Sequence, residues 1–308
     1  SGEYEIWIKA ANGEGEAIQL TSGGDTYKFN LGWSPDSRYI AWSDQHYRLM
    51  VTEVPSGKTR MIAKSNFSHL DDFDWSPDSR WLAFTDGMPN RLDVIKVANL
   101  ETGEVKMITE KWYDSGYPSF SNDGKYLFFS SQRDFSPVYS ETEWNHAYIN
   151  SYRIYFAILD KATPSPFAPE NIDVNPVEEK NDKTSDKKAK KEKDNGDNKE
   201  SKVNVEIDFD GIAQRIVALP IEPGLYYNIS CVDGKVYYNR RFQVRKDNEG
   251  LFVFDLDKEK EQSLGDYFYT LSPDNKKMLV GKNKRWKVIG LPSSSISIDE
   301  PVDLSGMK

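Results

Sequence analysis

Three histidines and one cysteine are the side chains of this sequence best suited to hold a metal ion or to act as a base or nucleophile. The histidines are His46, His69 and His146, and the cysteine is Cys231. No two histidines have the three-residue separation of a helical zinc site, and Cys231 lies far from all of them in sequence. We therefore expect no metal and no cofactor. His69 should lie on a loop or inner strand near the centre of the fold described below.

A serine followed two residues later by an aspartate recurs along the chain, and such a pair could supply a nucleophile and a carboxylate. The aspartates are Asp36, Asp78, Asp123 and Asp274. The sequence has neither the Gly-x-Ser-x-Gly elbow of a hydrolase nor a glycine-rich phosphate loop between a strand and a helix. Because each aspartate belongs to an equivalent turn in a different repeat, the four should lie far apart. We interpret them as turn residues that accept hydrogen bonds from their own backbone, and we expect no catalytic residue among them.

Two further charged groups are candidates for binding. The acidic segment 71–74 leads into a predicted strand and could line a pore, or it could be a solvated loop. Arg240, Arg241 and Arg245 follow another strand and could present a basic spot to a peptide carboxylate, or they could be ordinary surface charge. The lysine run 187–191 is interleaved with acidic residues, which favours a solvated spacer over an anion-binding site.

The Ser-Pro-Asp turns belong to a longer repeat that predicts the fold. In each copy an apolar residue ends one strand, a tight turn follows, and an alternating apolar run makes the next strand. The copies are centred near Trp33, Trp75, Phe120, Leu271 and, in a degenerate form, Cys231. Their spacing of about 40 to 45 residues, with four strands per unit, is typical of a β-propeller. Cys231 takes the place of a large apolar residue, so we expect it to be buried and inert.

The repeats predict one all-β domain over residues 3–304. Two half-units, 4–21 and 203–219, lack the turn motif but read as strand pairs. With the five motif-bearing units they predict seven blades of four-stranded antiparallel sheet. Whether the ring closes stays open. The N-terminal half-blade could be completed by segment 296–304 or by strands that lie outside this chain.

Composition limits the partners of the chain. Its 308 residues carry a net charge of −9, which argues against a nucleic-acid surface. No apolar run is long enough to span a membrane, and no signal-peptide pattern opens the chain, which we expect to begin inside a longer protein. The charged segment 178–202 has almost no apolar residues, so we expect a disordered insertion. Segment 135–150, rich in aromatic residues, is expected to be an irregular excursion within one blade.

The repeated turn, followed by an aromatic–aliphatic strand, resembles the PD40/TolB-type propellers. The stretch 207–220, which reads Ile-Asp-Phe-Asp-Gly-Ile-Ala-Gln-Arg-Ile-Val-Ala-Leu-Pro, is more specific, as is the Gly-Leu-Tyr at 224–226. Together with the charged insertion before it and the strand at 155–159, this stretch resembles the end of the second propeller of tricorn proteases. The resemblance covers most of the chain.

The resemblance implies a function for the parent protein. Tricorn proteases are serine peptidases of the carboxyl-terminal-processing type, with two propellers before a catalytic core that contains a PDZ domain. The propellers are thought to guide unfolded peptides to that core, so the implied partners are unfolded peptides and the PDZ and catalytic domains of the same parent chain. The chain ends at Lys308, about where the core would begin, and it matches no catalytic residue of the family. The family also implies a cytoplasmic, homo-oligomeric parent; a signal peptide on the native protein would instead make it periplasmic.

Two other functions fit the repeats alone. One is a stand-alone TolB-like module that docks a protein partner in an envelope complex. The other is the propeller lid of a prolyl-oligopeptidase-like enzyme. The sequence that follows Lys308 in the parent would distinguish them: a PDZ-like segment, a stop, or an α/β-hydrolase with its Gly-x-Ser-x-Gly motif.

Overall fold

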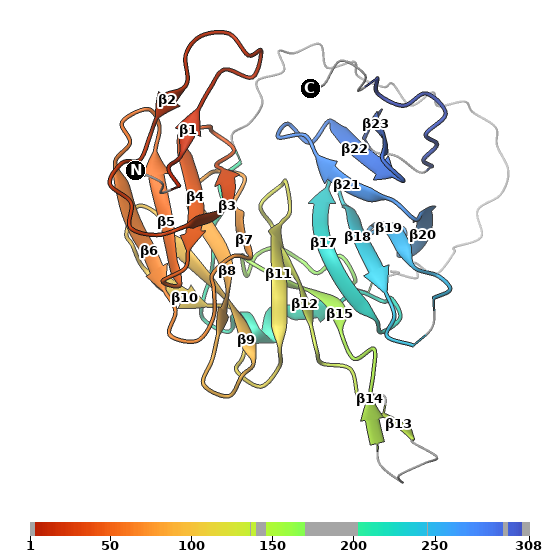
Figure 1. Cartoon of the computed structure of the whole chain (residues 1–308). Helices are drawn as coiled ribbons and strands as arrows, with labels where there is room; N and C mark the ends of the chain where they lie inside the picture. The colour runs from red at the N-terminus through yellow and green to blue at the C-terminus, as the bar shows by residue number, and fades with distance from the viewer. Residues whose placement is uncertain are drawn as a thin grey trace, which may run out of the picture.

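Five antiparallel sheets stand side by side around a common axis and form a β-propeller (Figure 1). The structure is a computed structural model that describes residues 4–135, 137–139, 146–169, 203–244, 246–291 and 295–303. No helix of the described residues is long and apolar enough to cross a membrane.

Each blade is numbered here in chain order and given from its inner to its outer strand. Blade 1 consists of β3 (Lys28–Trp33), β4 (Tyr39–Asp44), β5 (Arg48–Glu53) and β6 (Thr59–Lys64). Blade 2 consists of β7 (Phe73–Trp75), β8 (Trp81–Gly87), β9 (Asp93–Asn99) and β10 (Val105–Met107). Blade 3 consists of β11 (Ser115–Phe120), β12 (Tyr126–Ser131), β15 (Arg153–Ile158) and β16 (Ile216–Ala218). Blade 4 consists of β17 (Leu225–Val232), β18 (Lys235–Arg241), β19 (Gly250–Asp255) and β20 (Lys260–Gly265), and blade 5 of β21 (Phe268–Leu271), β22 (Lys277–Lys282) and β23 (Arg285–Gly290).

The repeated turn joins the first and second strands of every blade, as the sequence predicts. In blade 1, for example, β3 ends at Trp33 and β4 begins at Tyr39. The residue after the aspartate adopts a left-handed backbone, with φ of 60° at Ser37, 73° at Gly124 and 55° at Asn275. Glycine and asparagine tolerate this conformation best. Turn chemistry therefore fixes the same hairpin in each unit.

The core is a series of apolar layers between neighbouring blades rather than one central cluster. Leu49 and Val51 of blade 1 pack with Leu82 and Phe84 of blade 2. Equivalent layers lie between blades 2 and 3, between blades 3 and 4, and between blades 4 and 5. Successive residues of a strand therefore face the two neighbouring blades in turn. This is why strands whose apolar side chains alternate with a period of two residues fit this fold.

The prediction of seven blades was wrong, because the described residues form five. Segment 203–219 is not a half-blade of its own. After the gap in the described chain, residues 203–209 run along blades 2 and 3, and a single 3-10 turn, η1 (Ile212–Arg215), leads into β16 as the outer strand of blade 3. Val205 holds segment 203–209 against blade 2. Its N–H donates to Asp78 Oδ2 at 2.8 Å, and its carbonyl accepts from Trp81 Nε1 at 3.2 Å. A segment that reads as a separate pair of strands thus contributes a single outer strand, β16, to an existing blade across a long insertion.

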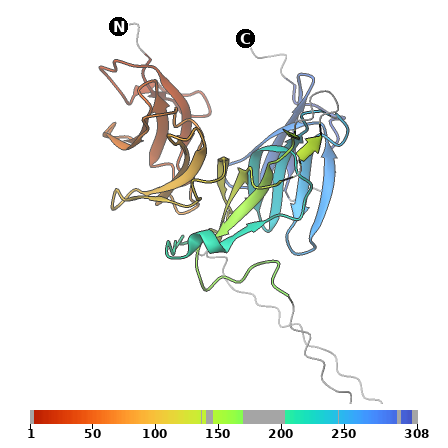
Figure 2. The same ribbon diagram turned by 90° about the horizontal axis from the view of Figure 1, so that it is seen from below.

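The N-terminal half-unit is present as a hairpin of β1 (Trp7–Ile8) and β2 (Ile18–Gln19), which packs Ile6 and Leu20 on Ile40 and Trp42 of blade 1. The C-terminal segment does not complete it. Instead Val302 N–H donates to the Trp286 carbonyl of β23 at 2.7 Å, and Ile296 and Ile298 pack on blade 5. Figure 2 shows the result, an arc with blades 1 and 2 on one limb and blades 4 and 5 on the other.

The excursion predicted at 135–150 contains a hairpin of β13 (Pro137–Tyr139) and β14 (His146–Tyr148), which projects from one end of the propeller (Figure 1). Its base is tied to the loop after β18, because the backbone N–H groups of Asn150 and Gln243 each donate to the other's side-chain oxygen, at 2.9 and 3.0 Å. The predicted disordered insertion 178–202 and its lysine run lie outside the described residues.

Candidate functional site

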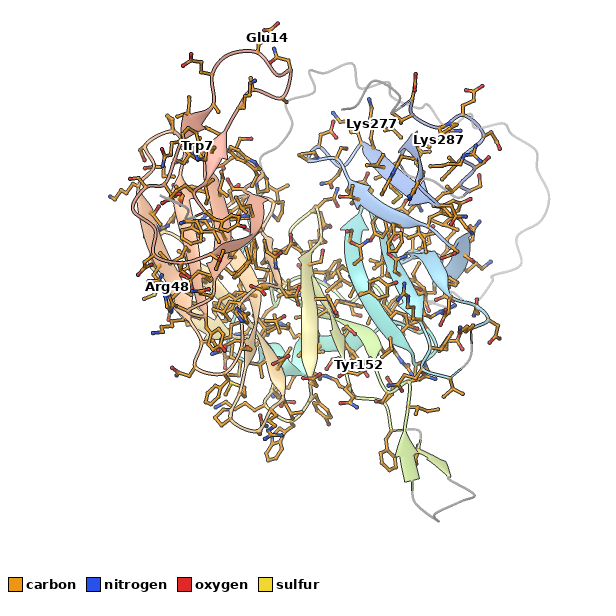
Figure 3. The ribbon with its side chains drawn as sticks, in the orientation of Figure 1. Trp7, Glu14, Arg48, Tyr152, Lys277 and Lys287 are labelled. Carbon is orange, nitrogen blue, oxygen red and sulfur yellow. The ribbon has the colours of Figure 1, made fainter. Side chains whose placement is uncertain are left out.

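The inner strands β3, β7, β11, β17 and β21 have two ends with different chemistry. Figure 3 marks both: Lys277, the first residue after a repeated turn, and Tyr152, beside the base of the projecting hairpin. We call these the turn end and the hairpin end. Each end holds a cavity, of about 700 Å³ at the turn end and about 600 Å³ at the hairpin end.

The turn end is built from the repeated motif. In blade 1, Ser34 Oγ donates to Asp36 Oδ1 at 2.7 Å, and Arg38 N–H donates to the same oxygen at 3.0 Å. Asp78, Asp123 and Asp274 make the same two contacts in their own blades. The aspartates are therefore turn residues, as predicted. Cys231 is buried at this end, and burial raises the pKa of its thiol, so it is protonated and unreactive at neutral pH.

The hairpin-end cavity, which we call the acidic pocket, is lined by blades 2, 3 and 4 and by the loop before blade 2. Four of its side chains are carboxylates: Asp71, Asp72, Asp93 and Asp114. None of the four forms an ion pair with a lysine or arginine of the described residues. Nearby Asp86, in contrast, binds Lys96 Nζ at 2.5 Å. The pocket therefore carries uncompensated negative charge, which favours a cationic ligand.

The acidic segment 71–74 has a structural task as well. Asp72 Oδ2 accepts from Thr85 Oγ1 at 2.7 Å and from the N–H of Tyr117 at 2.6 Å, and Asp74 Oδ2 accepts from the N–H of Phe120 at 2.8 Å. These two carboxylates thus join β7 to β11. Asp71 accepts a hydrogen bond from Ser43 of blade 1. Asp71 and Asp72 thus line the acidic pocket, while Asp74 lines the turn-end cavity. Whether any of them lines an axial pore stays a prediction.

Burial opposes the ionisation of these carboxyls. It raises the pKa of Asp72, and it raises that of Asp74 to about 7, against the lowering effect of the backbone N–H donors. The pKa of Asp93 is raised first by burial and then by the charges of Asp114, Asp86 and Asp72. Carboxylates that crowd one another in this way gain from a cation placed between them.

Asp114 is held by two donors, and Asp93 by none. Asp114 Oδ1 accepts the N–H of Asp93 at 2.7 Å, and its Oδ2 accepts the hydroxyl of Tyr152 at 2.6 Å. Burial and this hydrogen bond raise the pKa of Tyr152, so its hydroxyl remains a donor. The carboxylate of Asp93 accepts no hydrogen bond from a described residue, so it is available to a ligand.

The two adjacent arginines of β18 have opposite roles. Arg240 is fully buried, donates to both carboxylate oxygens of Glu261 at 2.8 and 3.0 Å, and stacks on the ring of Phe252. The prediction that it presents a surface charge to a ligand was wrong for this residue. Arg241 points to the other face of the sheet, lies over the ring of Tyr227 and is among the residues that line the acidic pocket. Arg245 lies outside the described residues.

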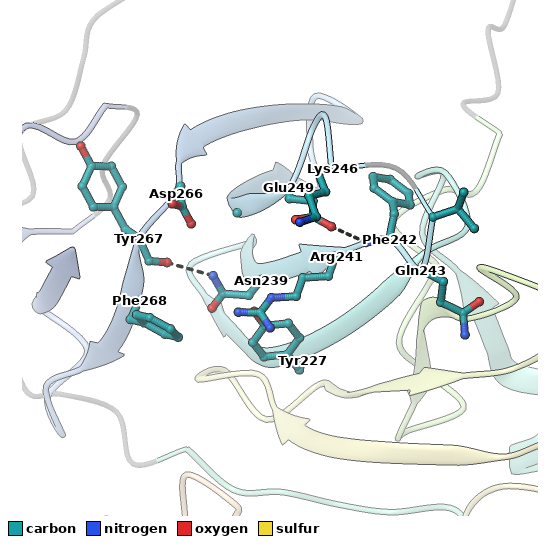
Figure 4. Close-up of a pocket in the computed structure, with 12 residues that line it drawn as sticks. Tyr227, Asn239, Arg241, Phe242, Gln243, Lys246, Glu249, Asp266, Tyr267 and Phe268 are labelled. Atoms are coloured by element: carbon teal, nitrogen blue, oxygen red, sulfur yellow. Dashed lines mark hydrogen bonds between the residues drawn. The ribbon is translucent and has the colours of Figure 1, made fainter. Parts of the chain in front are cut away.

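A second cavity of about 330 Å³ adjoins the acidic pocket and shares Tyr227 and Arg241 with it. Figure 4 shows this cavity, with Asn239 bonded to the Tyr267 carbonyl and the Phe242 N–H bonded to Glu249. Lys246 and Phe268 also line it. We call the two cavities together the hairpin-end groove. It runs from an end where carboxylates predominate to an end of mixed charge.

The histidines add little to this site. His69, which was predicted to lie near the centre of the fold, lines the acidic pocket. Its ring packs edge-on against Tyr47, with ring centroids 4.5 Å apart. His46 lies in the turn between β4 and β5, and His146 lies on β14. Within the described ranges, no group of three or more His, Cys, Asp or Glu side chains could hold a metal ion.

Sequence reasoning missed Asp93, Asp114, Tyr117, Tyr152 and Tyr227. In a propeller the loops before each inner strand and the loops after each second strand meet at one end, so polar residues from these two loop classes converge. A search of those loops across all units, rather than of contiguous motifs, would have found the pocket.

Comparison with known proteins identifies the class and then the family. The solved structure of tricorn protease superposes with a TM-score of 0.71 at 17% identity, over 94% of this chain and 28% of that one. TolB from Acinetobacter baumannii superposes with a TM-score of 0.55 at 16% identity, over 93% of this chain and 57% of that one. At such identities these matches show the fold alone, a β-propeller.

Sequence matches are more specific. The family model of the tricorn protease second beta propeller domain matches residues 1–291, so the chain belongs to that family. Tricorn protease homolog 1 of Streptomyces coelicolor is 27% identical over 93% of this chain, and the tricorn protease homolog of Saccharolobus solfataricus is 27% identical over 80% of it. The chain covers only 28% and 21% of those two relatives.

Proposed function

We propose that this propeller guides unfolded peptides to the catalytic core of a tricorn-type serine peptidase. Membership of the second-propeller family supports the parent activity. The observation that carries the proposal is the hairpin-end groove, an uncompensated polar and aromatic surface where the blades differ from one another. The chemistry would be performed by a catalytic core and a PDZ domain elsewhere in the parent protein.

The size and lining of the groove suit an extended chain. The acidic pocket, at about 600 Å³, is in the range that holds a few side chains and is far too small for a folded domain. Tyrosine rings offer apolar contact, and the serine, threonine and tyrosine hydroxyls of the lining offer partners to peptide backbone groups. A folded protein has already paired its own backbone groups, so it has less to gain from this surface.

The direct test is a binding titration with this chain. A fluorescent, unstructured peptide without net charge should bind saturably by fluorescence anisotropy, and unlabelled unfolded peptide should compete for the site. A small folded domain of similar length should not compete. Equal competition by the folded domain, or no saturable binding, would contradict the proposal.

The same chain should cleave none of these peptides, because no catalytic residue of the family matches its sequence. Incubation followed by mass spectrometry checks this expectation. Robust cleavage that a serine-directed inhibitor abolishes would show that the chain has an activity of its own.

A further inference from the structure

We propose that a row of aromatic rings beside blade 1 binds the large apolar side chains that an extended peptide carries at alternate positions. The row consists of Tyr4, Tyr27, Phe29, His69 and Tyr47, and we call it the ring row. This inference rests on the proposed function, because it names the class of peptide that the groove receives. Folded proteins bury such side chains, so the ring row favours unfolded chains over folded ones.

The rings contact one another in an unbroken series. Tyr4 packs on Tyr27 with ring centroids 4.9 Å apart, and Tyr27 stacks on Phe29 at 6.4 Å. Phe29 meets His69 edge-on at 6.2 Å, and His69 meets Tyr47 edge-on in turn. Alternate side chains of an extended peptide lie roughly 6.6 to 6.8 Å apart. Two steps of the series are close to that repeat, so successive apolar side chains of the peptide can each contact a successive ring.

The series is open to solvent and leads into the groove. Tyr4, Tyr27 and Phe29 are 61%, 50% and 37% exposed. Single exposed apolar side chains are common, but rings gathered on one surface indicate a binding site. His69, near the end of the series, also lines the acidic pocket. A peptide on the ring row therefore continues into the hairpin-end groove, whose hydroxyl groups offer partners to its backbone.

The side chain of Phe29 lies on the face of blade 1 that is turned toward blade 2. Ser43 is the cross-strand partner of Phe29 and donates a hydrogen bond to Asp71, in the loop before blade 2. Directly opposite residues of an antiparallel pair share one face of the sheet. Lys28, which precedes Phe29 and has the opposite orientation, instead lies over the ring of Trp42. A strand or blade added to that other face of blade 1 would therefore not cover Phe29.

The aromatic pair on this inner strand is not part of the repeat. Tyr27 and Phe29 lie six and four positions before Trp33, the apolar residue of the first copy. The same two positions hold other pairs in the other blades: His69 and Asp71 in blade 2, Asp114 and Gly116 in blade 3, Leu225 and Tyr227 in blade 4, and Gly265 and Tyr267 in blade 5. The blade scaffold forms with any of these pairs, so it does not require two rings here. Exposed rings that the scaffold does not need can serve a ligand.

The experiment compares three short peptides of glycine, serine and threonine that are N-acetylated, without net charge and labelled at the carboxyl end. The first carries three phenylalanines at alternate positions. The second has the same composition with the phenylalanines three residues apart, so that successive rings point to opposite sides of an extended chain. The third has serine in place of each phenylalanine. By fluorescence anisotropy we expect the first to bind about tenfold more tightly than the second, the scale of two lost ring contacts, and the third to bind most weakly.

Three variants locate the effect. Phe29→Ala and Tyr27→Ala each remove one partly exposed ring, so both should fold normally by circular dichroism and lose most of the preference for the alternate arrangement. Trp112→Ala removes a ring that is 81% exposed but lines a different cavity, beside η1, and should keep the preference. Binding of the phenylalanine-free peptide should be nearly the same for all these proteins, because its contacts lie in the groove.

The outcomes separate the two proposals. If the two phenylalanine peptides bind the wild type equally well, or if Phe29→Ala and Tyr27→Ala both retain the full preference, the ring row is not the site while peptide guiding stands. If no peptide binds at all, both proposals fail. A preference that Trp112→Ala reduces as much as Phe29→Ala would assign it to exposed rings in general and overturn the site.

Sedimentation of the wild type and of Phe29→Ala tests a different occupant of the ring row, a second copy of this chain. We expect both proteins to sediment alike. A wild-type dimer that dissociates on this substitution would assign the rings to a contact between copies and overturn the proposal.

Discussion

The two ends of the inner strands are made from the same five blades, yet only one end repeats. At the turn end, Asp36, Asp78, Asp123 and Asp274 each accept from a serine hydroxyl and a backbone N–H in the same geometry. At the hairpin end, the equivalent loops carry different residues in every blade. Repetition marks groups that hold each blade together, while the unrepeated end provides the groups that can distinguish ligands.

The same difference, between a structural role and a place in the groove, is found between two adjacent residues of one strand. Arg240 and Arg241 follow one another on β18, so their side chains face opposite sides of the sheet. The strand register alone decides that Arg240 forms a buried ion pair with Glu261 and that Arg241 lines the groove. Sequence proximity to a candidate site is therefore a poor guide in this fold, and strand parity is a better one.

The largest expected effect comes from Arg240→Ala. This change leaves Glu261 without its bidentate partner and removes the cation from the ring of Phe252, at a cost of about 3 to 5 kcal/mol in the free energy of unfolding. Arg241→Ala should change that free energy by less than about 0.5 kcal/mol, as expected of an exposed side chain. Urea denaturation of the two variants gives the comparison. Equal losses would mean that the two residues do not differ as described.

Asp78→Ala should have the next largest effect and tests the repeated end. Asp78 accepts from Ser76 and Arg80, as its counterparts do, and also from the N–H of Val205, which anchors the returning segment between blades 2 and 3. Loss of these three bonds should cost about 2 to 3 kcal/mol. Asp274→Ala removes only the two turn contacts at an exposed position, so its midpoint in urea should lie closer to that of the wild type. If the two variants unfold together, the contact with Val205 contributes nothing.

The next prediction concerns pH and the carboxylates that join β7 to β11. Burial raises the pKa of Asp74 to about 7 in the folded chain, against an ordinary value near 3.8. The folded state therefore holds a proton that the unfolded state has released, and stability should fall as the pH rises from about 4 to 7. Asp74→Asn keeps an acceptor for the N–H of Phe120 and removes this loss, so at pH 8 it should stabilise the fold by roughly 2 kcal/mol.

The measurement is the free energy of unfolding of both proteins at intervals from pH 5 to pH 8. The difference between them should grow with pH and level off above about 7. A difference that is constant across this range would show that Asp74 does not titrate there. Asp255 is a useful reference, because Lys235 holds the pKa of that carboxyl down at about 2 and it cannot contribute in this window.

Much of the scaffold was accessible from sequence because its signals are local. The turn motif and the period of its recurrence predict the propeller, the strand order inside each blade and the buried state of Cys231. The blade count was wrong because strand pairing across a long insertion is not local: residues 203–219 read as a unit, and only the contacts of Val205 and the pairing of β16 with β15 assign them to blade 3.

The groove was only partly accessible for a related reason. His69 could be placed near the axis, because it precedes a recognisable turn motif, whereas the acidic segment 71–74 was left open between a pore lining and a solvated loop. Asp93 begins β9, whereas Asp114 and Tyr152 lie in the loops before β11 and β15, and the three positions share no common sequence pattern. The pocket exists only where these segments meet. Nor did the sequence reveal the bulges in the inner strands, where the strand register shifts between Phe29 and Gly32, Gly116 and Ser119, and Tyr227 and Ser230.

These bulges give the last and smallest prediction. The residue three positions before the apolar residue of the repeat (Trp33, Phe120 or Cys231) has a left-handed backbone in blades 1, 3 and 4, with φ of 47° at Asn30, 57° at Tyr117 and 53° at Asn228. Asparagine adopts this conformation readily, whereas a bulky aromatic residue does so at a cost. Tyr117 therefore lowers the stability of blade 3 through its backbone conformation, and its side chain is half-exposed in the acidic pocket.

Tyr117→Asn should relieve this strain and raise the free energy of unfolding by about 1 kcal/mol, while weakening peptide binding because the pocket loses an aromatic wall. Asn228→Tyr makes the reciprocal change in blade 4 and should destabilise, since it also removes the bond from Asn228 Nδ2 to the Tyr269 carbonyl at 3.0 Å. Urea denaturation and the anisotropy titration measure the two effects on the same samples. If Tyr117→Asn lowers stability, the ring packs favourably enough to outweigh its backbone, and the tyrosine belongs to the scaffold rather than to the groove.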